Sequence, residues 1–89
     1  MGTGGWWVVL EENQGAGERE WTLSHSQAVG ERESARAEAL RLAREHVPAH
    51  PWFLRARQVL RISPDAYLVI ATGRTSTFHF RVLVAELVE

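Results

Sequence analysis

The fold of this chain is decided by residues 53–84, which read FLRARQVLRISPDAYLVIATGRTSTFHFRVLV. Two segments within it, residues 63–66 (SPDA) and 73–76 (GRTS), consist of residues that favour turns. They separate three β-favouring runs. We therefore predict strands over about residues 53–62, 66–72 and 77–84. The middle run is apolar at nearly every position, and side chains of a strand alternate between the two faces of a sheet. This sheet therefore needs cover on both faces.

Two more strands are predicted before this stretch. Trp6–Leu10 is a short apolar run rich in β-favouring residues. Arg19–Ser24 alternates, with Trp21 and Leu23 on one side, as is typical of a half-buried strand. The segment between the two runs, residues 13–18, contains two glycines and is predicted to be a hairpin loop.

A single amphipathic helix is predicted from Glu31 to about His46, after a connection over residues 25–30. The residues of one helix face recur with helical spacing. They are Ala35, Ala39, Leu42, Ala43 and His46. Pro48 ends the helix at or before Val47. The alanines on this face predict a close approach of helix to sheet.

These elements predict an α+β fold with two layers. Their order is ββαβββ, which suggests a five-stranded, mainly antiparallel sheet with one helix packed on one face. The length of 89 residues fits a single domain over residues 1–89, with a flexible N-terminus over residues 1–5.

The register of the last three strands decides which side chains share a face. If both turns hold an even number of residues, Leu60 and Ile62 join Tyr67, Val69 and Phe80 beneath the helix. The opposite face then mixes apolar and basic side chains. Its members are Arg57, Arg61, Leu68, Ile70, His79 and Arg81. An odd first turn would instead bury Leu68 and Ile70 beside Leu60 and Ile62, and would turn Tyr67 and Val69 outward. The middle strand is apolar on both sides in either register.

The composition limits the classes of protein that this chain resembles. All ten basic residues are Arg, which we interpret as the codon bias of a bacterial genome rich in G and C. Net charge is −1, with an acidic first half and a basic segment over residues 50–84. There is no cysteine, no long apolar run and no leader pattern. We expect a cytoplasmic protein without disulfides or a membrane segment.

The mixed face predicts an interaction surface. Leu68 and Ile70 supply an apolar centre, and Arg57, Arg61, His79 and Arg81 supply a polar rim, as in many protein interfaces. A homodimer or a protein partner would cover this face. The alternatives are cover by the first hairpin or the C-terminal segment, or by the stems of the arginines themselves. A nucleic-acid-binding module using the same basic face is the second functional alternative.

Catalytic and metal-binding patterns are weak. His46 and His50 are four residues apart, but Pro48 between them prevents a shared helix. Neighbours within Ser24–Ser26 point to opposite faces of a strand, so His25 does not activate either hydroxyl. Asp65, the single aspartate, lies in a turn where its usual role is to bond backbone amides. We therefore expect no enzyme activity, no catalytic residues, no cofactor and no metal.

Overall fold

In the part of the chain that the structure describes, five strands and one helix follow one another in the predicted order. A computed structural model describes residues 5–14, 20–48 and 54–89. The elements are β1 (Trp6–Gln14), β2 (Glu20–Gly30), α1 (Arg32–Glu45), β3 (Ala56–Ser63), β4 (Ala66–Thr72) and β5 (Thr77–Glu86). The predictions for residues 1–4, for Gly15 and Gly17 of the first loop, and for His50 fall outside the described residues.

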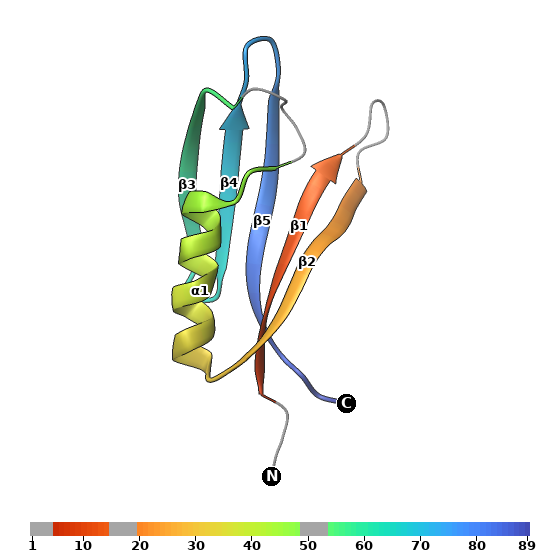
Figure 1. Cartoon of the computed structure of the whole chain (residues 1–89), viewed down its shortest axis with the longest axis vertical. Coiled ribbons are helices and arrows are strands. Elements are labelled where there is room, and N and C mark those ends of the chain that lie inside the picture. Colours follow the sequence, from red (N-terminus) through yellow and green to blue (C-terminus); the bar gives the residue numbers. More distant parts are fainter. Residues whose placement is uncertain (1–4, 15–19, 49–53) are drawn as a thin grey trace.

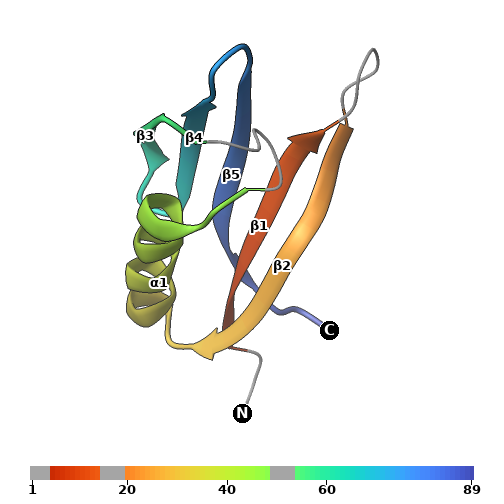
Figure 2. The same ribbon diagram turned by 45° about the horizontal axis from the view of Figure 1, so that its top comes forward.

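The five strands form one antiparallel sheet in the order β2-β1-β5-β4-β3 (Figure 1). The chain leaves the sheet at the edge strand β2, passes along α1 on one face, and enters the sheet again at the other edge, β3 (Figure 2). The two-layer α+β fold, with α1 packed on one face of a five-stranded sheet, is thus confirmed.

The core lies between α1 and the sheet. The helix buries the predicted small-residue face, namely Ala35, Ala39, Leu42 and Ala43. The sheet contributes Val8, Leu10, Tyr67, Val69, Phe80 and Val82, all at most 5% exposed. Burying a valine, leucine or phenylalanine side chain contributes about 1.5–3 kcal/mol. These contacts are therefore the main source of the stability of the fold.

Strand β2 differs from its prediction in length and in burial. It continues to Gly30, whereas residues 25–30 were predicted to be a connection. The ladder with β1 persists because two register shifts, between Trp6 and Trp7 and between Leu10 and Glu11, let the strands bend while staying paired. The predicted half-burial is wrong. Most of β2 is exposed, because β2 is an edge strand.

Strand β3 pairs with β4 in the register expected for an odd first turn, which places Leu60 and Leu68 on one face, but this face lies away from α1 rather than beneath it. Strands β4 and β5 pair as predicted, with Val69 opposite Phe80. However, β3 has a register shift between Arg61 and Ser63, so Leu60 pairs with Leu68 and Val59 pairs with Val69. One extra residue in a strand sends the side chains on its two sides to opposite faces. The bulge therefore turns β3 over while β4 keeps its predicted orientation.

Candidate functional site: the open face of the sheet

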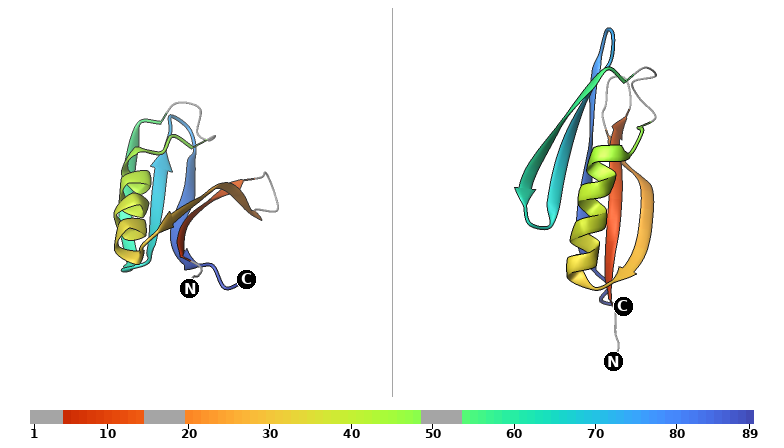
Figure 3. Two further views of the ribbon diagram at one scale, coloured as in Figure 1. Left: turned by 60° about the horizontal axis from the view of Figure 1, so that its bottom comes forward. Right: turned by 60° about the vertical axis from the view of Figure 1, so that its left-hand side comes forward.

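The sheet face opposite α1, called the open face below, gathers side chains from all five strands. Cross-strand pairing assigns to it Trp7, Val9, Glu11, Asn13, Trp21, Leu23, Leu60, Leu68, Ile70, His79, Arg81 and Leu83. No helix or strand of the described residues lies over this face (Figure 3). Figure 3 also shows the β1–β2 hairpin curving away from β3 and β4.

The apolar side chains of the open face remain partly accessible. Leu68, Ile70 and Leu83 are half-buried by their neighbours in the sheet. Leu60 keeps 44% and Leu23 keeps 58% of its surface exposed. Intramolecular cover by the first hairpin or the C-terminal strand does not occur within the described residues, because both lie in the same sheet.

Four of the six residues predicted for this surface lie on it: Leu68, Ile70, His79 and Arg81. The prediction of the same face for Arg57 and Arg61 is wrong, because the bulge in β3 places both on the helix side. Arg57 Nη1 donates a hydrogen bond of 3.0 Å to the carbonyl oxygen of Ala43, in the last turn of α1. The guanidinium of Arg61 lies 5.8 Å from the ring centre of Tyr67.

A compact polar and aromatic cluster occupies one end of the open face. Arg81 Nε donates to Glu11 Oε1 at 2.7 Å, and its guanidinium stacks over the Trp21 ring, 4.0 Å from the ring centre. The Trp21 and His79 rings meet edge to face, with centres 5.4 Å apart. The buried Oδ1 atom of Asn13 has no hydrogen-bond partner among the described residues. The cluster fixes the position of Arg81 and neutralises its charge.

Sequence reasoning missed Glu11, Asn13 and Trp21 as members of this surface. They meet His79 and Arg81 because β1 pairs with β5, which lies more than sixty residues further along the chain. No turn connects these two strands, so no turn sets their register. The available signal was limited to the alternation of Trp21 and Leu23, which placed both on one side of their strand.

On the other face of the sheet, which α1 covers, two sets of polar contacts attach the helix to the strands. Glu12 is 6% exposed, and its Oε2 lies 3.0 Å from Nε2 of His46, the residue at the C-terminal cap of α1. The His46 ring also packs edge to face on Phe80, with centres 5.1 Å apart. The predicted packing of His46 at the helix end is confirmed. A buried carboxylate and an imidazole with these contacts hold the helix end against β1 and β5.

The second set of contacts centres on Asp65, in the turn between β3 and β4. Its carboxylate accepts hydrogen bonds from Arg32 and from Nε of Arg36, the latter at 2.8 Å. These two guanidinium groups lower the pKa of Asp65 to about 2, and the hydrogen bond from Arg32 makes the largest contribution. The predicted role of Asp65 in bonding backbone amides is replaced by ion pairing, although the Asp65 amide does donate to Ser63 Oγ at 3.1 Å. The pairs attach the first turn of α1 to the β3–β4 turn.

Within residues 5–14, 20–48 and 54–89, no three His, Cys, Asp or Glu side chains gather in a way that could hold a metal ion. The helix of this region is too short and too polar to cross a membrane. Comparison with family models, curated proteins and solved structures gave no match.

Proposed function

We propose that this domain is a non-enzymatic binding module that associates with a second copy of itself through the open face. The observation that supports this proposal is the apolar surface of Leu60, Leu68, Ile70 and Leu83, which α1 does not cover. Contiguous apolar surface with a polar rim is typical of sites that bind another protein. A cytoplasmic location is a prediction from composition and is part of this proposal.

The charges of the open face favour a second copy as the partner. A two-fold symmetric contact brings one patch against the same patch, so an unbalanced charge would repel itself. Arg81 is paired with Glu11 inside the chain, at 2.7 Å. This part of the face is therefore close to neutral and suits a symmetric contact. His79 and Arg81 would then orient the two sheets, and Leu68 and Ile70 would supply buried area.

The size of the open face also suits a sheet-on-sheet contact. Five strands about 4.8 Å apart and roughly eight residues long outline a face of about 500 Å². The accessible surface of its projecting side chains is larger than this flat outline. A standard interface buries about 800 Å² on each partner. Two such sheets would pack face to face with their strands at about −30°.

The nucleic-acid alternative loses support on this face. It relied on four basic side chains, and Arg57 and Arg61 lie on the helix side. Arg81 is neutralised by Glu11. Nucleic-acid sites need several cations to meet phosphates, and the open face retains His79 and one paired arginine. Self-association is therefore the better-supported function.

Sedimentation velocity over a concentration series tests the proposal. The native chain should change from monomer to dimer as concentration rises. Ile70→Asp should remain monomeric, because a desolvated carboxylate at the centre of the contact opposes association. Val47→Asp is the matched control, because Val47 is 74% exposed and lies beyond the end of α1, away from the open face. A native chain that stays monomeric at the highest concentration would refute self-association.

A further inference from the structure

The outer edge of β3 offers a second binding site, whose outward-pointing backbone groups are not used in self-association through the open face. β3 is the last strand of the sheet, so one side of its backbone has no neighbouring strand among the described residues. Along such an edge, N–H and C=O groups of alternate residues point outward and can pair with another extended chain. Leu60, on this strand, is 44% exposed.

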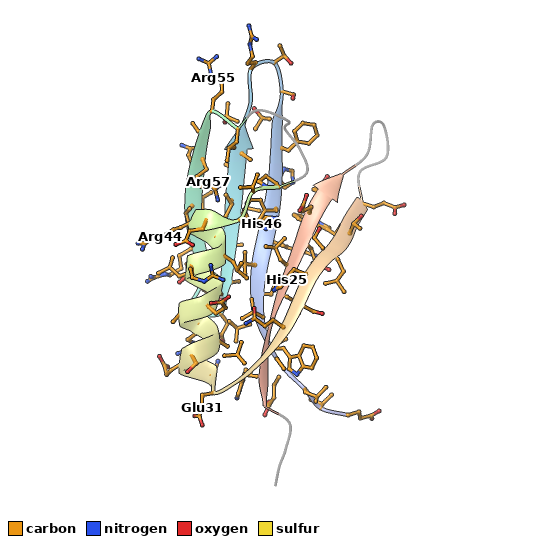
Figure 4. The ribbon with its side chains drawn as sticks, viewed as in Figure 1. His25, Glu31, Arg44, His46, Arg55 and Arg57 are labelled. Carbon is orange, nitrogen blue, oxygen red and sulfur yellow. The ribbon has the colours of Figure 1, made fainter. Side chains whose placement is uncertain are left out.

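The arginines without a carboxylate partner concentrate beside this edge. Four arginines of the described residues form ion pairs: Arg32, Arg36, Arg41 and Arg81. Five described arginines have no such pair, and four of these lie on β3, just before it, or beside it on α1. The four, called the arginine strip below, are Arg44, Arg55, Arg57 and Arg61. Figure 4 shows Arg44, Arg55 and Arg57 on the same side of the molecule.

The bulge in β3 creates this arrangement. It turns Arg57, Val59 and Arg61 to the helix side. Arg57 then reaches the Ala43 carbonyl at 3.0 Å, next to Arg44 on the helix. The opposite side of β3 presents Gln58 and Leu60. The edge strand is therefore basic on one side and partly apolar on the other.

A second copy of β3 is disfavoured at this edge in the antiparallel register centred on Val59. If two copies paired antiparallel about Val59, Arg57 of each would stand opposite Arg61 of the other. Like charges directly opposite each other across strands are destabilising. Arginines on an edge strand thus discourage pairing between copies, and they select a partner of opposite charge.

The chemistry of the edge also favours a peptide over a nucleic acid. Single-stranded nucleic acids bind where bases stack on exposed aromatic rings. The aromatic ring beneath the strip, that of Tyr67, is only 5% exposed. The apolar neighbours Val59 and Leu60 and the open backbone edge instead suit a strand.

We propose that the β3 edge binds an extended acidic segment of another protein by strand addition. Carboxylates on one side of the added strand would face Arg57 and Arg61, with Arg44 beside them. Apolar side chains on its other side would lie beside Leu60. Main-chain hydrogen bonds would give affinity, and the alternation of acidic and apolar residues would give specificity.

Fluorescence anisotropy with a defined probe tests this proposal. The probe is a short fluorescein-labelled peptide in which glutamate and valine alternate. We expect saturable binding that weakens as salt increases. The same peptide with N-methylated alternate amides, which cannot complete the ladder, should not bind. Equal binding of the N-methylated peptide would refute strand addition, and no binding of the parent peptide would refute the proposal outright.

Charge reversal locates the site. Arg61→Glu and Arg44→Glu should each weaken peptide binding about 3- to 10-fold, since one charge contact with the peptide changes from attractive to repulsive, from β3 for Arg61 and from α1 for Arg44. Arg74→Glu is the matched control, because Arg74 lies in the β4–β5 turn and also has no carboxylate partner among the described residues. Equal weakening by all three variants would indicate general charge attraction and overturn the assignment to β3.

Two further outcomes separate this surface from the alternatives. A single-stranded oligonucleotide that displaces the peptide and binds more tightly would overturn the choice of an acidic peptide. The Ile70→Asp variant should keep its affinity for the peptide, and Arg61→Glu should keep the association state of the native chain. A native chain that does not self-associate would therefore not contradict strand addition at β3. Likewise, a native chain that does not bind the peptide would not contradict self-association.

Discussion

The two faces of the sheet are built from the same strands, yet only one is covered. Strand β4 makes the contrast within a few residues. Val69 and Ala71 are fully buried beneath α1, while Leu68 and Ile70 between and beside them are half-exposed on the open face. A polar outer face would have been sufficient for a solvated antiparallel sheet. The apolar residues on the open face are therefore not required by the core of the monomer.

The faces also differ in what their charged groups do. On the helix side, polar pairs hold α1 at both ends, through Asp65 at its start and through Glu12 and His46 at its end. On the open face, Glu11 and Arg81 link two neighbouring strands of the sheet itself. The first set attaches one layer to another, whereas the second neutralises a surface.

The largest difference between the faces should appear on truncation of neighbouring residues of β5. Phe80→Ala should lower the free energy of unfolding by about 3–5 kcal/mol, because the ring is 1% exposed and its removal leaves a cavity. His79→Ala, on the open face, should cost less than about 1 kcal/mol. Urea denaturation of both variants measures the difference. Similar losses would mean that both faces are equally buried in solution.

The end of the helix should show the next largest effect. His46→Ala removes a hydrogen-bonding partner from the buried carboxylate of Glu12 and an edge-to-face contact with Phe80. We expect a loss of about 1–3 kcal/mol in the free energy of unfolding. Val47→Ala, one residue further on and 74% exposed, is the control and should change stability by less than about 0.5 kcal/mol. Equal effects would place the helix end in solvent.

Local patterns in the sequence predicted the helix, the strands and the part of the site that β4 and β5 contribute. The alanine face of α1 has helical spacing, and β5 alternates clearly, with Phe80 and Val82 on its buried side. The short GRTS turn fixed the β4–β5 register, so Leu68, Ile70, His79 and Arg81 were correctly grouped on one face. These predictions succeeded because each depends on residues close together in the chain.

The orientation of β3 could not be predicted in the same way. Val59 lies at an odd-numbered position and Leu60 and Ile62 lie at even-numbered positions, so apolar residues fall on both faces of the strand. Alternation therefore gives no preferred face for β3. Its orientation is set by the bulge between Arg61 and Ser63 and by contacts with α1, such as the bond from Arg57 to Ala43. Such contacts join distant segments. The same is true of the cluster of Glu11, Trp21 and Arg81, which depends on pairing between the first and last strands.

The smallest of the expected effects concerns pH and the start of the helix. The pKa of Asp65 is about 2 in the folded chain, below its ordinary value of 3.8, because Arg32 and Arg36 stabilise the charged carboxylate. A carboxyl group with a lowered pKa contributes stability above its unfolded pKa, and this contribution is lost as pH falls toward the folded pKa. The helix-covered face should therefore lose the polar attachment at the start of α1 between about pH 4 and pH 2.

Thermal unfolding of Asp65→Asn across this range tests the attachment. The variant keeps the shape of the side chain, and the backbone amide of residue 65 can still donate to Ser63 Oγ, so the change is mainly one of charge. Its melting temperature should lie below that of the native chain at neutral pH, and the gap should close toward pH 2. Glu33→Gln is the control: this carboxylate also bonds Arg36 but is 84% exposed, so its loss should lower the melting temperature less. A gap for Asp65→Asn that persists unchanged at pH 2 would show that turn geometry, rather than the two ion pairs, holds α1 to the sheet.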